Sequence, residues 1–166
     1  MKKLDKEILS YLKWCADKFL SFRPRSENEL VRYLQQKVKK RHPEILEEQD
    51  DYINEIISQF KEANGINDGE FVGWWVTERS YFKPRSERVL RLELKQKGVS
   101  SELVDEYFAA HPPQNTSLLK QLIQKKAFVI DFSSDKNIEK LTQHLLRRGF
   151  SYSEIKKAIE EYRNSV

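Results

Sequence analysis

Basic side chains at helical spacing are the residues in this sequence best suited to chemistry, and that chemistry is the binding of anions. Arg88, Arg91 and Lys95 follow one another at intervals of three and four residues, and Arg85 lies just before them. In a helix this spacing places them along one side, away from the apolar side. Such a stripe can meet the phosphates of a nucleic acid or an acidic protein groove.

A second basic stripe lies further along the chain, on one side of another expected helix. Its members are Lys140, His144, Arg147 and Arg148. The alternative for both stripes is an ordinary solvated face, in which Glu87 and Glu93 pair with some of the arginines. The sequence leaves both interpretations open.

A repeated turn, Pro-Arg-Ser-Glu, supplies two further candidates, Arg25 and Arg85. Each copy precedes an expected helix, and the unpaired backbone N–H groups of a helix N-terminus attract anions. The serines of the turn, Ser26 and Ser86, fit the simpler role of N-caps that fix the start of the helix.

Two adjacent tryptophans, Trp74 and Trp75, point to different sides of an expected helix. Trp75 shares its side with Phe71. Trp74 either packs against a neighbouring repeat or stays exposed, where it could stack on a base or anchor a protein contact.

No arrangement of residues predicts catalysis, a metal site or a cofactor. His42, His111 and His144 are scattered, and Cys15 occupies an apolar helical position that suits a buried thiol. A single cysteine excludes a disulfide framework, and no Gly-x4-Gly-Lys phosphate loop is present. We therefore expect a non-enzymatic protein.

The composition favours long helices with a heavily charged surface. Of the 166 residues, 39 % are hydrophobic and 34 % charged, with only five glycines and five prolines. The net charge of +4 permits a nucleic-acid partner without demanding one, and the excess lies in residues 114–166, which carry 10 Lys+Arg against 6 Asp+Glu. With no segment able to span a membrane and a lone cysteine, the sequence predicts a cytoplasmic protein. Nothing in the sequence suggests a coiled-coil dimer, so a monomer is expected.

A degenerate internal repeat dominates the organisation of the chain. The segment from Phe22 to Glu27 recurs, with one conservative change, from Phe82 to Glu87. A fainter third copy aligns the apolar-Gly-apolar-Ser pattern around Gly98 with the one around Gly149. The sequence thus predicts an all-α fold of three tandem three-helix, helix-turn-helix-like repeats in an elongated or curved array, covering residues 1–64, 65–113 and 114–166.

Helix punctuation divides each repeat into three helices. Asp68 is the expected N-cap of the fourth helix, and capping boxes are expected at Ser26 with Glu29 and at Ser151 with Glu154. The expected helices cover residues 5–20, 26–39, 43–63, 68–82, 86–97, 101–110, 116–129, 135–148 and 151–163, with a linker at 111–113.

Several segments resemble the bacterial RecX family, regulators of the recombinase RecA. The stretch Leu-Leu-Arg-Arg-Gly-Phe-Ser-Tyr at 145–152 is the most specific. Glu-Leu-Lys-Gln-Lys-Gly-Val at 93–99, Trp-Val-x-x-Arg at 75–79 and the Gly-Ile-Asn-Asp-Gly-Glu-Phe entry at 65–71 are similar to the family in order and spacing. The resemblance covers about residues 8–162. The sequence departs from the family pattern in the first repeat, where a longer basic turn at 37–43 replaces the family's Lys-Gly turn.

The resemblance implies a role in homologous recombination and DNA repair. Its expected partner is the RecA–single-stranded DNA filament, with weaker binding to duplex DNA, and its expected effect is inhibition of the recombinase ATPase and of strand exchange. The candidate contact residues for this partner are basic residues of the stripes, the repeated turns and the Trp-Val-x-x-Arg segment: Arg25, Arg79, Arg85, Arg88, Arg91, Lys95, Lys140, Arg147 and Arg148. The alternatives are a stand-alone helical DNA-binding module, which would bind duplex tightly, and a protein-only scaffold, whose binding would hardly respond to salt.

Overall fold

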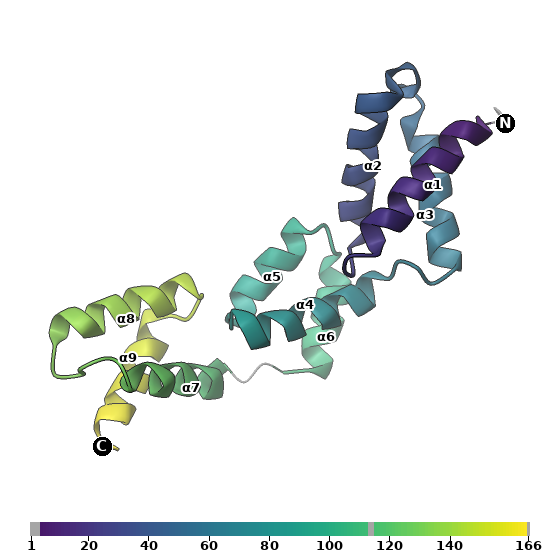
Figure 1. Cartoon of the computed structure of the whole chain (residues 1–166). Helices are drawn as coiled ribbons and strands as arrows, with labels where there is room; N and C mark the ends of the chain where they lie inside the picture. Colours follow the sequence, from purple (N-terminus) through teal and green to yellow (C-terminus); the bar gives the residue numbers. More distant parts are fainter. Residues whose placement is uncertain (1–3, 113–114, 166) are drawn as a thin grey trace. The chain divides into compact units, whose positions relative to one another are not determined.

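The computed structural model describes residues 4–112 and 115–165, and all regular structure in these ranges is helical (Figure 1). The helices follow one another in three triplets, as the repeat predicted, so the all-α tandem fold is confirmed. Their bounds are α1 Lys6–Leu20, α2 Glu27–Arg41, the 3₁₀ turn η1 Pro43–Ile45, α3 Gln49–Glu62, α4 Asp68–Phe82, α5 Glu87–Gln96, α6 Ser101–Ala110, α7 Asn115–Ala127, α8 Asp135–Arg147 and α9 Tyr152–Arg163.

The chain forms two compact units that divide the middle triplet between them. The first unit comprises Met1–Trp75 and Leu94–Tyr107, and the second comprises Val76–Glu93 and Phe108–Val166. Helices α4, α5 and α6 therefore each contribute residues to both units. The predicted repeat boundaries after residues 64 and 113 stay predictions, and Pro113 of the predicted linker lies outside the described residues.

The first unit has its core where α1, α2 and α3 pack against one another (Figure 1). Leu12, Leu30 and Ile53 represent the three helices in this core and are almost fully buried. Cys15 lies among them at 1 % exposure, which confirms the expected buried thiol. Apolar residues at helical spacing on all three helices thus supply the driving force for this packing.

The second unit has an equivalent core, in which α9 contacts both α7 and α8. Leu145 and Ile155 are fully buried there, and Ile123 and Phe150 are nearly so. The apolar segment at 128–132 forms turns between α7 and α8. The helices of this triplet end within two residues of the predicted positions.

Local capping fixes most helix starts. Asp5 accepts the backbone N–H groups of Glu7 and Ile8 at the start of α1. Both predicted capping boxes form, at Ser26 with Glu29 and at Ser151 with Glu154. Such caps satisfy N–H groups that have no partner within the helix, at a gain of about 1 kcal/mol each.

One predicted helix start and one predicted capping residue are wrong. The predicted single helix over 43–63 is interrupted, because η1 turns the chain after Pro43 and buries Ile45 before α3 begins at Gln49. Asp68 does not cap its own helix: Asn67 Oδ1 accepts the backbone N–H groups of Gly69 and Glu70 at the start of α4. The Asp68 carboxylate instead serves the start of α2.

Candidate nucleic-acid interface

The N-terminus of α2 is the docking point for the second triplet. The Ser26 hydroxyl donates to the backbone carbonyl of Lys97 at 2.6 Å, and it also accepts the N–H of Glu29 at 3.2 Å. Asp68 Oδ1 accepts the N–H of Glu27 at 2.8 Å. Burial raises the pKa of the Asp68 carboxyl, against the lowering effect of that backbone hydrogen bond. We call this contact region the first joint.

Glu29 is the charged centre of the first joint. Its Oε1 lies 2.8 Å from Arg23 Nη2 and 2.6 Å from Lys97 Nζ, and its side chain is only 15 % exposed. Burial opposes its ionisation, but the hydrogen bonds from Arg23 and Lys97 outweigh burial and lower the pKa of Glu29 to about 2. The carboxylate therefore stays charged and holds two cations from different triplets.

The N-terminus of α5 repeats this arrangement in the second unit, where it forms the second joint. The Ser86 N–H donates to the carbonyl of Arg148 at 2.9 Å, and the Glu87 N–H donates to Asn115 Oδ1 at 3.3 Å. Arg148 Nη1 in turn donates to the carbonyl of Pro84 at 3.0 Å. Asn115, the first residue of α7, thus takes the place that Asp68, the first residue of α4, has in the first joint.

A glycine with a left-handed backbone lies at each joint. Gly98 has φ +79° and Gly149 has φ +95°. A side chain at Gly98 would collide with Asn28, and one at Gly149 would collide with Ser86 and Val89. The two turns therefore need glycine for their backbone conformation and for close approach.

Five of the nine predicted contact cations are half-buried and engaged by contacts within the chain. Arg91 pairs with Glu87 at 2.6 Å and covers the ring of Phe108. Arg79 and Arg85 both approach Glu93, at 2.8 and 3.7 Å.

The other two of these five cations lie at the joints. Arg25 covers the Phe19 ring at 4.0 Å, and burial lowers its pKa. Arg148 bonds Pro84 and donates from Nε to His144 Nε2 at 3.0 Å. The pKa of Arg148 is lowered by burial and by Arg85. These contacts give the five a structural role, and their binding role stays a prediction.

The remaining four predicted cations are exposed. Across residues 4–112 and 115–165, no hydrogen bond or ion pair engages their side chains. They are Arg88 and Lys95 on α5 and Lys140 and Arg147 on α8. Exposed cations without carboxylate partners are suited to phosphate contacts. Each predicted stripe is therefore split between exposed cations and cations used for structure.

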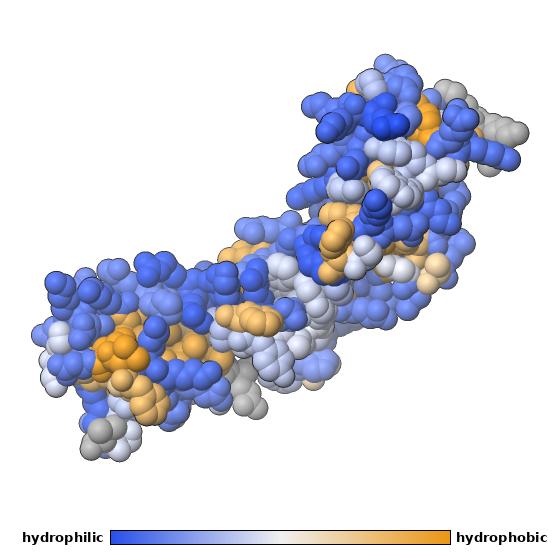
Figure 2. All heavy atoms as spheres, in the orientation of Figure 1, coloured by the Kyte–Doolittle hydropathy of each residue, from blue (hydrophilic) through white to orange (hydrophobic). Residues whose placement is uncertain are grey.

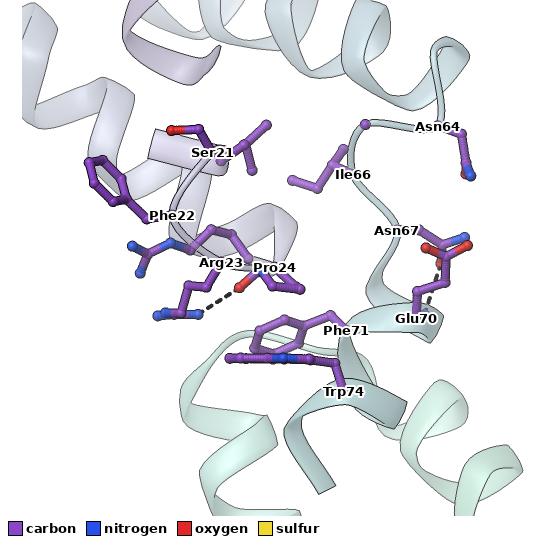
Figure 3. Close-up of a pocket in the computed structure, with 13 residues that line it drawn as sticks. Ser21, Phe22, Arg23, Pro24, Asn64, Ile66, Asn67, Glu70, Phe71 and Trp74 are labelled. Carbon is purple, nitrogen blue, oxygen red and sulfur yellow. Dashed lines mark hydrogen bonds between the residues drawn. The ribbon is translucent and has the colours of Figure 1, made fainter. Parts of the chain in front are cut away.

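A pocket beside the first joint was not predicted from the sequence (Figure 3). It has a volume of about 470 Å³ and is lined by the turn after α1, by the segment at 64–67 and by α4. Arg23 donates to the carbonyl of Pro24 at 2.7 Å and lies over the Trp74 ring at 5.6 Å (Figure 3). Trp74 thus meets the first triplet, one of the two outcomes left open by the sequence.

Within the described ranges, no three His, Cys, Asp or Glu side chains come together as a metal site. No helix there has the length and apolar character needed to cross a membrane. Burial, followed by the charge of Arg148, lowers the pKa of His144.

Two family models match the second and third triplets. The model described as RecX, second three-helix domain, matches residues 67–107. The model described as RecX, third three-helix domain, matches residues 114–159.

Curated relatives carry the name regulatory protein RecX. The protein of Bacillus pumilus is 32 % identical over 146 residues, which cover 86 % of this chain and 52 % of the relative. That of Streptococcus pyogenes serotype M5 is 32 % identical over 160 residues, covering 91 % and 55 %. This chain therefore spans about half the length of these relatives.

Solved structures share the fold. The crystal structure of RecX from Lactobacillus salivarius superimposes with a TM-score of 0.70 at 25 % identity, covering 93 % of this chain and 96 % of that one. A second crystal structure, of a regulatory protein RecX, has a TM-score of 0.63 at 19 % identity and shows the fold alone.

Proposed function

Because this chain belongs to the RecX family, we propose that it is a regulatory protein that binds the RecA–single-stranded DNA filament and inhibits its ATPase and strand exchange. The mode of action is binding without chemistry. Membership of the family carries the proposal, since the relatives are named as regulatory proteins.

The exposed cations are the proposed contact points. Arg88 and Lys95 on α5, with Lys140 and Arg147 on α8, present charge that no carboxylate in the described residues neutralises. Each contact with a phosphate or an acidic protein side chain is weak alone, and several on one chain add through their linkage. The two joints fix the turns beside these helices in the free protein. Less conformational entropy is therefore lost when the protein binds.

DNA-dependent ATP hydrolysis by a cognate RecA, with this protein titrated from substoichiometric amounts, tests the proposal. Inhibition at less than one molecule per RecA is expected, because a bound regulator would affect neighbouring protomers of the filament. Full ATPase activity at every ratio, with the protein folded by circular dichroism, would contradict the proposal.

A matched pair of variants assigns the contact surface in the same assay. The quadruple variant Arg88→Gln, Lys95→Gln, Lys140→Gln and Arg147→Gln should inhibit poorly. Lys39→Gln with Lys40→Gln removes exposed charge from α2 and should inhibit like the unmodified protein. Equal inhibition by both variants would remove α5 and α8 from the contact surface.

A further inference from the structure

Each triplet exposes one phenylalanine where its first helix ends. Phe22 lies two residues after α1, Phe82 is the last residue of α4, and Phe128 directly follows α7. Their exposed fractions are 81 %, 77 % and 91 %. Apolar surface is visible at the ends of α4 and α7 in Figure 2, on a face that is otherwise mostly hydrophilic.

The recurrence is the informative feature. A single exposed apolar residue on a soluble protein is ordinary. Here three large rings stay in water at the same structural position, although each triplet has apolar core positions nearby. Packing within a triplet does not require these rings, which suggests that they contact something outside the chain.

The charge around the three rings indicates the chemistry of that partner. No acidic residue occurs between Lys18 and Ser26, between Arg79 and Ser86, or between Lys120 and Ile130, in a chain that has 26 acidic residues. Exposed lysines adjoin two of the rings: Lys83 follows Phe82, and Lys125 and Lys126 precede Phe128.

A flat apolar ring within an acid-free basic segment matches single-stranded nucleic acid, which offers stacking faces and phosphates together. A purely apolar protein partner would not need the cations. Duplex DNA keeps its bases stacked on one another, so its base faces are closed to such rings.

We propose that Phe22, Phe82 and Phe128 are base-stacking contacts for single-stranded DNA, one in each triplet, with the neighbouring cations on the phosphates. The inference rests on the proposed function only in that single-stranded DNA is a component of the filament. It adds the contacts to the bases, which the exposed cations of α5 and α8 do not provide.

The pocket beside the first ring supports this assignment in the first unit. Phe22 lies at the edge of the hollow that also holds Arg23 and Trp74 (Figure 3). Trp74 is half-buried, so part of its ring remains available as a second stacking surface. The hollow thus brings ring faces together within one unit, beside the Arg23 guanidinium, which is paired with Glu29, and beside Glu70.

Binding of fluorescein-labelled oligothymidylate without recombinase, followed by anisotropy, tests the inference. Phe22→Ala, Phe82→Ala and Phe128→Ala are each expected to weaken binding roughly 5-fold or more, with a larger loss in the triple variant. Phe82→Trp should retain the affinity. Leu46→Ala, which shortens an exposed apolar side chain between Glu44 and Glu47, should bind like the unmodified protein.

An abasic oligonucleotide of the same length separates stacking from charge. The alanine variants should bind it like the unmodified protein, and the salt dependence of their binding to oligothymidylate should keep its slope, because stacking releases no counterions. Unchanged affinity of the triple variant for oligothymidylate would overturn the inference. An equal loss on the abasic oligonucleotide would overturn it too.

The recombinase ATPase assay distinguishes failure of the inference from failure of the proposed function. If the triple variant loses inhibition but binds oligothymidylate normally, the rings contact protein and the inference is wrong. If the alanine variants lose affinity for oligothymidylate while the unmodified protein leaves the ATPase unaffected, the base contacts stand and the proposed function fails. Circular dichroism melting should be unchanged for all variants, since the three rings are exposed.

Discussion

The Ser26 hydroxyl donates a hydrogen bond to the backbone carbonyl of Lys97, 71 residues further along the chain. The corresponding serine of the second copy, Ser86, contacts the carbonyl of Arg148 through its backbone N–H instead. The difference follows from position N3 of each helix. Glu29 occupies the N–H of Ser26 in its capping box, whereas Val89 at the equivalent position leaves the Ser86 N–H available.

Replacing the glycine of the first joint should destabilise the first unit. Gly98→Ala forces a side chain into a left-handed conformation and against Asn28. We expect a loss of at least about 1–2 kcal/mol in the free energy of unfolding, measured by urea denaturation. Gly73→Ala is the control, because its new Cβ would meet Tyr107 Cε2 at an ordinary 3.7 Å. That helical substitution should be neutral or stabilising by up to about 1 kcal/mol. Equal stability of Gly98→Ala and the unmodified protein would refute the role of the turn.

Two adjacent arginines should respond differently to the same substitution. Arg147 has an exposed side chain, whereas Arg148 bonds the carbonyl of Pro84 and the ring of His144. Arg147→Gln should therefore keep the melting temperature but weaken binding to single-stranded DNA and lower its salt slope by about one ion. Arg148→Gln should lower the unfolding free energy by about 1–2 kcal/mol. A lower melting temperature for Arg147→Gln than for Arg148→Gln would contradict this division.

The second joint should weaken in mild acid through His144. Burial and the adjacent Arg148 lower its pKa below the ordinary 6.5, so the unfolded chain takes up a proton at higher pH than the folded protein. The contribution of neutral His144 to the free energy of unfolding is complete above pH 6.5 and declines as the pH falls below 6.5. His144→Gln should flatten this decline in thermal melts between pH 7 and pH 5. An identical decline in the variant would assign it to other groups.

Local signals account for what the sequence could predict. Serine and glutamate at capping distance, prolines before helices and glycines after them act within a few residues, so most helix limits are confirmed. The prediction of one helix over 43–63 was wrong, because a 3₁₀ turn that buries Ile45 precedes α3. No residue pattern near Pro43 predicts that turn. The prediction that Asp68 caps its own helix was also wrong, because its carboxylate accepts the N–H of Glu27, 41 residues earlier, at the start of α2.

The fate of each arginine could not be predicted, because it depends on contacts distant in sequence. The predicted basic stripe included both Arg147 and Arg148, yet a carbonyl 64 residues away engages only Arg148. The pairing of Glu93 with Arg79 crosses from α4 to α5. The alternative of an ordinary solvated face correctly predicted that Glu87 and Glu93 pair with arginines. The exposed cations have no such partner among the described residues, and their role in binding stays a prediction.

Glu29 should make the first joint sensitive to strong acid. Its pKa in the folded protein is about 2, against 4.5 as its ordinary value, so its contribution to stability is complete above about pH 4.5. That contribution is lost progressively as the pH falls from 4.5 towards 2, because the unfolded chain binds the proton first. Glu29→Gln removes the charge that holds Arg23 and Lys97, and should lower the unfolding free energy at pH 7 by about 1–3 kcal/mol.

The pH dependence separates this role from simple packing. Urea denaturation at pH 7, 4 and 3 should show the difference between Glu29→Gln and the unmodified protein shrinking as the pH falls. Glu55→Gln, an exposed substitution on α3, provides the matched loss of one charge and should follow the unmodified protein at each pH. A destabilisation of Glu29→Gln that is equally large at pH 3 and pH 7 would mean that shape rather than charge holds the joint.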